Sequence, residues 1–109
     1  MMIWTVAALN ESVAAEIAAL APDMQARYGR IADLLIKYGP QEVGMPYVRP
    51  LGGKLWEIRL RGRTGIARII YVAASRQRLI LLHAFIKKSQ ETPARALAIA
   101  RSRLREVLP

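Results

Sequence analysis

The chain has 109 residues and a formal net charge of +9, with no cysteine and a single histidine. This length supports one modest hydrophobic core, so we expect residues 1–109 to form a single domain. The composition excludes disulfides and thiolate metal sites, and a single histidine argues against a classical metal cluster. We therefore expect no metal and no other cofactor.

Membrane and secretion signals are missing from the sequence. No run reaches the roughly 18 consecutive apolar residues of a membrane span. The first residues, MMIWTVAALNE, lack the basic start and long apolar stretch of a signal peptide. The sequence therefore predicts a cytoplasmic protein that has no membrane partner.

A short strand and two helices are predicted at the start of the chain. The run MIWTVA, residues 2–7, has the composition of a strand. Asn10 is placed to cap a helix that ends near Ala21, because its side-chain oxygen can accept from an early backbone amide. Pro22 suits the first turn of a second helix, and apolar residues at spacings of four and three extend this helix to residues 39–40.

Beyond the second helix, the apolar period changes from that of a helix to that of a strand. Residues 40–53 contain three prolines and three glycines, so we expect no regular element there. Three strands of alternating or continuous apolar character follow, separated by the turns GRTG and SRQR. These strands span residues 54–61, 66–73 and 79–86. Their short connections predict a three-stranded antiparallel meander.

A final helix is predicted to begin near Pro93, with Thr92 as its cap. Its arginines are expected to point largely outward: Arg95, Arg101, Arg103 and Arg105. The predicted order is β-α-α-β-β-β-α. This is an α+β fold in which two N-terminal helices and a C-terminal helix pack on a small twisted antiparallel sheet.

Basic residues are concentrated in the second half of the chain. Residues 1–53 hold four basic and five acidic side chains, a net charge of −1. Residues 54–109 hold thirteen basic and three acidic side chains, a net charge of +10. This asymmetry favours a polyanionic partner, of which nucleic acid is the commonest. A solvated basic face that serves only solubility is the alternative.

Arg68 lies in the middle of the apolar strand GIARIIYV. An unpaired guanidinium that faced the core would cost on the order of several kcal/mol. Arg68 must therefore pair with a carboxylate, for which Glu57 on the preceding strand is the nearby candidate, or face a wet concave surface. In the second case Arg68 and Arg59 line a hollow on the sheet, and Lys87 and Lys88 project into it.

These motifs carry a resemblance to a known family. LWEIRLRGRTGIARIIYV and LILLHAFIKKSQETP resemble the HigB-type branch of the RelE/ParE superfamily of bacterial toxins, which shares an E-x-R strand, an R-x-x-Y strand and an L-L-H-x-F-x-K-K strand followed by T-P. The matching positions here are Glu57, Arg59, Arg68, Tyr71, Leu81, Leu82, His83, Phe85, Lys87, Lys88, Thr92 and Pro93. The resemblance implies a toxin that cleaves mRNA on the ribosome and is held inactive by a cognate antitoxin, commonly one with a helix-turn-helix DNA-binding domain.

The implied reaction, attack by the 2′-OH of the preceding nucleotide, suits the side chains available. Arg68 can stabilise the transition state because a guanidinium is permanently charged and binds two phosphate oxygens at once. Crowded positive charge lowers lysine pKa values, and we favour Lys87 before Lys54 for proton transfer. The candidate catalytic residues are thus Arg68, Lys87, Lys54 and Arg59. The candidate RNA-binding residues are Lys88, Arg61, Arg49 and Gln90.

Several aromatic residues have two interpretations. His83 could act as a general base, but its apolar strand favours a buried, hydrogen-bonded imidazole. Tyr71 could take part in catalysis, but a strand tyrosine is usually a core residue with its hydroxyl at the surface. Trp56 and Phe85 could stack a base, but their alternating strand positions favour the core. The sequence has no aromatic residue after Phe85, unlike the RelE branch, whose last segment ends in a catalytic tyrosine.

Two other functions stay open at this point. ParE-type members of the same superfamily share the fold but inhibit DNA gyrase and cut no RNA, and fold alone does not separate the two activities. A simple RNA-binding module would show salt-sensitive binding without turnover.

Overall fold

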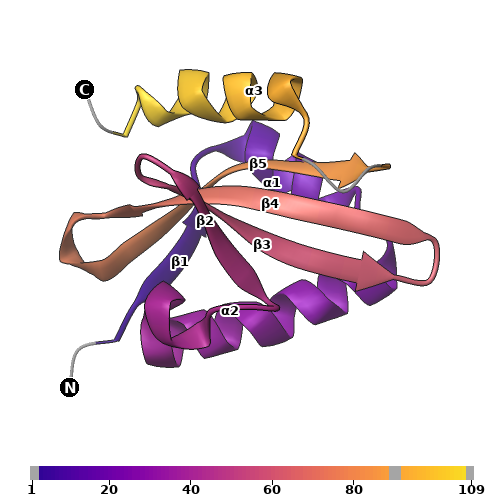
Figure 1. Ribbon diagram of the computed structural model, residues 1–109, viewed down its shortest axis with the longest axis horizontal. Helices are drawn as coiled ribbons and strands as arrows, with labels where there is room; N and C mark the ends of the chain where they lie inside the picture. The colour runs from indigo at the N-terminus through magenta and orange to yellow at the C-terminus, as the bar shows by residue number, and fades with distance from the viewer. Residues whose placement is uncertain (1–2, 89–91, 108–109) are drawn as a thin grey trace.

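The computed structural model describes residues 3–88 and 92–107, which form three α-helices packed on one five-stranded sheet (Figure 1). The strands are β1 (Thr5–Ala8), β2 (Val48–Gly52), β3 (Leu55–Gly62), β4 (Gly65–Ala74) and β5 (Arg78–Lys87). The helices are α1 (Glu11–Ala18), α2 (Pro22–Val43) and α3 (Ala94–Leu104), with a short 3₁₀ turn, η1 (Ser75–Gln77), between β4 and β5. The predicted α+β fold class is confirmed.

The sheet has the strand order β1-β5-β4-β3-β2. Strands β3, β4 and β5 form the predicted antiparallel meander, and β2 extends it at one edge by pairing with β3. At the other edge β1 runs parallel to β5, with Thr5 opposite Arg78, so the sheet is mixed rather than purely antiparallel. Parallel pairing is available to β1 because a long connection, which includes both N-terminal helices, separates it from β5.

The helices cover the two faces of the sheet unequally. In Figure 1, α2 crosses one face and α3 lies over the other. Ile58 and Leu60 of β3 belong to the core beneath α1 and α2, whereas Leu55 belongs to the smaller core beneath α3. Strand alternation therefore puts Glu57 and Arg59 on the α3 face. Because α3 packs on β5 and β4, it leaves part of this face uncovered near β2 and β3.

The segment at residues 40–53 is more regular than predicted. The expectation of no regular element is wrong, because Val48–Gly52 forms the edge strand β2. An edge strand tolerates Pro50, since a missing N–H there removes no essential ladder bond, and the pairing shifts register just after it. The second helix also passes its predicted end and reaches Val43, but Gly39 breaks it with a φ of +79°.

Of the predictions for two helix caps and for the direction of the α3 arginines, the first cap is confirmed, and the second cap and the direction of Arg103 are wrong. Asn10 caps α1 as predicted, because its side-chain oxygen accepts from the Val13 amide at 3.1 Å. Thr92 does not cap α3; Pro93 holds the N-cap position without a side-chain hydrogen bond, and the Thr92 hydroxyl donates to Glu57. Arg103 does not point outward, because it binds a carboxylate of α1.

Three further observations concern the first strand, membrane spans and metal sites. The strand predicted over residues 2–7 is observed at Thr5–Ala8. Met2, at the start of the predicted range, lies outside the described residues. Within residues 3–88 and 92–107, no helix has the length and apolar character needed to cross a membrane. The same residues contain no group of three or more side chains suited to holding a metal ion.

Candidate functional site

Arg68 lies on β4, opposite Arg59 of β3. Only 4% of its side chain is exposed, its Nη1 donates to the Ala67 carbonyl at 3.0 Å, and its Nε lies 3.5 Å from Oε1 of Glu57. Burial lowers the pKa of Arg68 and the Glu57 carboxylate opposes this change. A guanidinium stays charged under such shifts. The sequence left two alternatives open, a carboxylate partner or a concave surface, and Arg68 has both features, since it also lines a pocket.

Glu57 is the common partner of three arginines. Its carboxylate is fully buried, and its Oε1 accepts from Nε of Arg49 at 2.8 Å. Nη1 of Arg59 lies 3.6 Å from the same oxygen, and the Thr92 hydroxyl donates to Oε2 at 2.9 Å. We call Arg49, Glu57, Arg59 and Arg68 the arginine cluster. Three guanidinium groups around one carboxylate leave a net charge of +2, which suits an anionic ligand.

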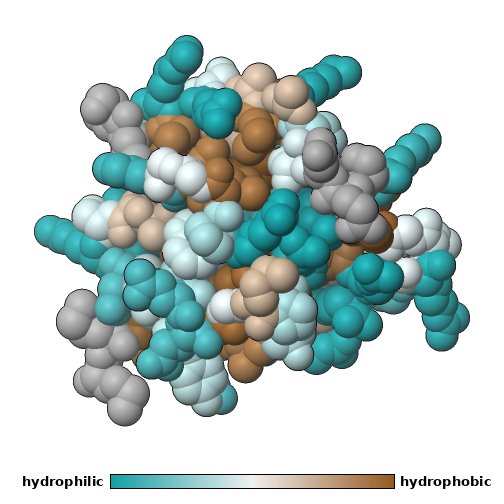
Figure 2. Space-filling model, viewed as in Figure 1, coloured by the Kyte–Doolittle hydropathy of each residue, from teal (hydrophilic) through white to brown (hydrophobic). Residues whose placement is uncertain are grey.

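A pocket of about 210 Å³ opens beside the arginine cluster. It is lined by Arg27, Pro46, Tyr47, Arg59, Leu60, Arg61, Ile66 and Arg68. Four of these side chains are arginines, which come from α2, β3 and β4. Figure 2 shows hydrophilic side chains gathered on this side of the molecule, over the strands beneath α3. The pocket therefore combines a concave shape with a strongly positive wall, as a phosphate ligand requires.

Lys87, the last residue of β5, lies close enough to the arginine cluster to interact with it electrostatically. Its side chain is buried, and desolvation together with the charge of Arg68 lowers the pKa of Lys87, while Glu57 opposes the shift. This direction agrees with the expectation from sequence. A lysine with a lowered pKa transfers a proton more readily near neutral pH than an ordinary one.

Other candidate residues lie at varying distances from the arginine cluster. Lys54 is exposed in the turn between β2 and β3, five residues before Arg59, which corresponds to about 16 Å along a strand. Arg61 lines the pocket, and Lys88 is exposed directly after β5. Gln90 lies outside the described residues. The pocket lining and the ion pairs of Glu57 include the arginines, and Lys87 interacts with Arg68, but Lys54 is not among these residues.

Tyr71 lies on the opposite face of the sheet from Arg68. Its side chain is fully buried, and its hydroxyl has no hydrogen-bond partner among the described residues, so the prediction of a hydroxyl at the surface is wrong. Burial raises the pKa of Tyr71 well above its usual value. Trp56 stacks on Tyr71 at 6.3 Å and packs against the same core, while Phe85 packs against the core beneath α3. Both aromatic residues are partly buried and pack against a core, as the core interpretation predicts, although Phe85 also lines a pocket.

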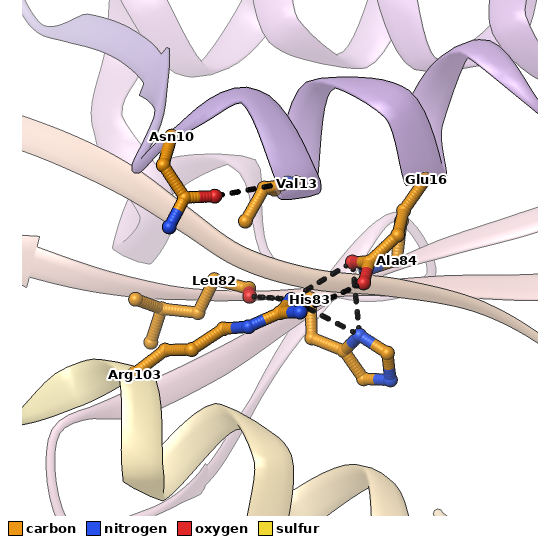
Figure 3. Close-up of polar contacts among 7 residues, drawn as sticks. All are labelled: Asn10, Val13, Glu16, Leu82, His83, Ala84 and Arg103. Carbon is orange, nitrogen blue, oxygen red and sulfur yellow. Dashed lines mark hydrogen bonds and ion pairs between the residues drawn. The ribbon is translucent and has the colours of Figure 1, made fainter.

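A second polar cluster joins α1, β5 and α3 (Figure 3). Oε1 of Glu16 lies 2.9 Å from Nδ1 of His83 and accepts from the Ala84 amide at 3.1 Å. Arg103 donates to both oxygens of Glu16 at 3.0 Å, and its Nη1 also donates to the Leu82 carbonyl at 2.8 Å. His83 is thus a hydrogen-bonded imidazole, as the sequence favoured, and its side chain is 12% exposed.

The second polar cluster predicts a pH dependence of stability. Burial raises the pKa of Glu16, but hydrogen bonds from Arg103, Ala84 and His83 bring it below the ordinary 4.5. A lowered pKa means that the carboxylate stabilises the fold above about pH 4.5, and that this contribution is lost as the pH falls through the folded-state pKa. Glu16→Gln should therefore lower stability by about 1–2 kcal/mol at pH 7 and by much less at pH 3. Thermal melts of both proteins across this range test the prediction, and a gap independent of pH would contradict it.

The observed α+β fold is the one implied by the resemblance to a RelE/HigB-like class of proteins associated with toxin–antitoxin pairs. The model of the family described as "Phage derived protein Gp49-like (DUF891)" matches residues 15–105, and the chain belongs to this family. No curated protein matches the chain. The family is toxin-like, and its association with toxin–antitoxin pairs points to an antitoxin as partner. The matched residues include both the arginine cluster and the Glu16, His83 and Arg103 side chains.

Sequence reasoning missed several of the residues that shape these sites. Arg27 reaches the pocket from α2, and Pro46 and Tyr47 reach it from the segment that was expected to be irregular. Glu16 meets His83 across 67 residues of sequence. The signals that could have found them are weak, because each contact joins elements whose relative placement depends on the whole fold.

Proposed function

We propose that this protein is a HigB-type toxin of a type II toxin–antitoxin system, a ribosome-dependent endoribonuclease that cleaves translated mRNA in the cytoplasm. The family membership supports a toxin. The observation that carries the nuclease proposal is the position of Arg68. Its guanidinium is held in a rigid strand by Glu57 and the Ala67 carbonyl, at the wall of an arginine-lined pocket.

The proposed reaction is cleavage by the neighbouring 2′-hydroxyl. The 2′-oxygen attacks phosphorus, the bond from phosphorus to the 5′-oxygen breaks, and the products are a 2′,3′-cyclic phosphate and a 5′-hydroxyl. One proton leaves the 2′-hydroxyl and one is given to the departing 5′-oxygen. Negative charge accumulates on the phosphoryl oxygens in the transition state. Arg68 stabilises it there, and Arg59 contributes a second guanidinium from the adjacent strand.

Lys87 is the candidate for proton transfer. Its lowered pKa makes its ammonium a better acid toward the 5′-oxygen than an ordinary lysine. We place Lys87 ahead of Lys54 because Lys87 interacts with Arg68, whereas Lys54 lies in an exposed turn at the far end of β3. His83 and Tyr71 take no direct part, since His83 is bound to Glu16 and Tyr71 lies on the other face.

The remaining basic residues bind the message and the antitoxin. Arg61, Lys88 and the exposed part of Arg49 extend the positive surface around the arginine cluster, and we assign them, with Gln90, to RNA binding. A cognate antitoxin, with a helix-turn-helix DNA-binding domain, neutralises the toxin by covering the same surface, because an acidic protein face complements it.

The proposal is tested by inducing the wild-type protein and mapping mRNA ends by primer extension. Cuts in codon register are expected within an actively translated message. The matched control is the same message with its start codon removed, which should stay intact if cleavage needs the ribosome. Growth arrest without cuts would contradict the nuclease proposal in favour of gyrase inhibition. Neither arrest nor cuts would leave a binding module and would also overturn it.

A further inference from the structure

A second pocket, of about 280 Å³, lies between β5 and α3. It is lined by His83, Phe85, Pro93, Arg95, Ala96 and Ile99. We propose that this pocket binds one nucleobase of single-stranded RNA whose adjoining phosphate lies at the arginine cluster. This inference rests on the proposed function and adds to it a subsite for the base.

The walls of the pocket suit the flat apolar faces of a base. The rings of His83 and Phe85 stack on one another with their centres 5.2 Å apart and their planes 21° apart, which gives one side an aromatic surface. The other side is formed by the apolar side chains of α3, including Ala96 and Ile99, and by Pro93 before it. Bases stack on such surfaces with little regard to sequence, because every base has a π face.

His83 offers a polar atom to a base edge. The Nδ1 atom of His83 carries its proton toward the Glu16 carboxylate, since a carboxylate accepts and does not donate. Arg103 holds Glu16 from both oxygens, so the imidazole has a defined orientation. Figure 3 shows the other ring nitrogen, Nε2, directed away from these contacts. Nε2 is therefore the atom that His83 offers to a ligand in the pocket it lines.

One wall of the pocket lies next to the arginine cluster. Phe85 pairs with Arg68 across β5 and β4, and paired residues on adjacent strands lie about 5 Å apart. A phosphate bound by Arg68 thus has the base pocket immediately beside it. Arg95 is exposed on the rim and adds positive charge on the far side. This charge pattern complements a nucleotide better than an apolar protein segment.

The test compares two probes of equal length and charge, a short single-stranded oligoribonucleotide and its abasic counterpart. Ile99→Trp fills the pocket without touching the arginine cluster. Ile86→Trp adds the same side chain at an exposed position on β5 outside the pocket and is the matched control. Binding is measured by fluorescence anisotropy at low salt on the full chain. Circular dichroism confirms that both variants fold.

The wild type should bind the oligoribonucleotide about tenfold more tightly than the abasic probe, because stacking adds to phosphate binding. Ile99→Trp should remove this difference, because it weakens binding of the oligoribonucleotide and leaves binding of the abasic probe unchanged. Ile86→Trp should keep the difference. Equal affinities of the wild type for the two probes would overturn the inference, as would an unchanged preference in Ile99→Trp. If Ile99→Trp instead escapes neutralisation by the antitoxin with RNA affinity unchanged, the pocket takes a protein side chain and the proposal is wrong.

These outcomes are independent of the nuclease test. Codon-register cuts without a base preference would leave the proposed function standing and remove the subsite. A base preference that Ile99→Trp abolishes, in a protein that makes no cuts, would establish the subsite on a binding module instead.

Discussion

Arg68→Ala is expected to reduce mRNA cleavage by about two to three orders of magnitude, which is the usual effect of removing one preorganised transition-state donor. The fold should survive because Glu57 keeps Arg49 and Arg59 as partners. The loss should therefore appear in primer-extension signal and in growth inhibition, while the circular dichroism spectrum and the melting transition stay close to those of the wild type.

Two variants sharpen the Arg68 prediction. Arg68→Lys keeps the positive charge but loses the paired N–H donors of the guanidinium, so partial activity is expected. Arg101→Ala removes the same charge from an exposed position on α3, and full activity is expected there, which separates a site effect from a change in net charge. Wild-type cleavage by Arg68→Ala would show that the guanidinium has only a structural role.

Glu57→Ala is expected to lower the free energy of unfolding by about 3–5 kcal/mol, the usual cost of removing one partner from a buried ion pair. The reason is the burial of Arg68. Arg49 and Arg59 are partly exposed and can turn to water, but the Arg68 side chain is only 4% exposed and would be left with the Ala67 carbonyl as its hydrogen-bond partner. Urea denaturation of the purified protein measures the change.

A double variant distinguishes pairing from packing at Glu57. Glu57→Leu with Arg68→Met replaces both buried charges by apolar side chains of similar size, and such replacements are often neutral. The double variant should therefore be more stable than Glu57→Ala by about 2 kcal/mol or more. Equal stabilities of the single and double variants would mean that the uncompensated charge of Arg68 is not the source of the loss.

Local patterns in the sequence predicted the centre of the fold well. The alternation of β3, with Ile58 and Leu60 on one side and Glu57 and Arg59 on the other, follows from a period of two and needs no long-range information. The meander β3-β4-β5 follows from two short turns. Strand β2 was missed because proline and glycine were counted against it, although an edge strand has one side without ladder bonds and accepts both.

The candidate site was predictable to the extent that neighbouring strands build it. Arg59, Arg68 and Lys87 come together through the register of one meander, and so they were expected as a group. The exact pairing depended on the length of a single turn, so the sequence left the partner of Arg68 open. Arg27 enters through packing of α2 on the sheet, which no local pattern specifies.

The parallel pairing of β1 with β5 bears on the order in which the protein can assemble during translation. Thr5 is made early but must wait for Arg78 before it has a partner in the sheet. The Glu57 carboxylate likewise waits for Thr92 to complete its contacts. Pairings so distant along the chain close slowly and late. A partly synthesised chain therefore carries the arginines of the arginine cluster without the scaffold that aligns them.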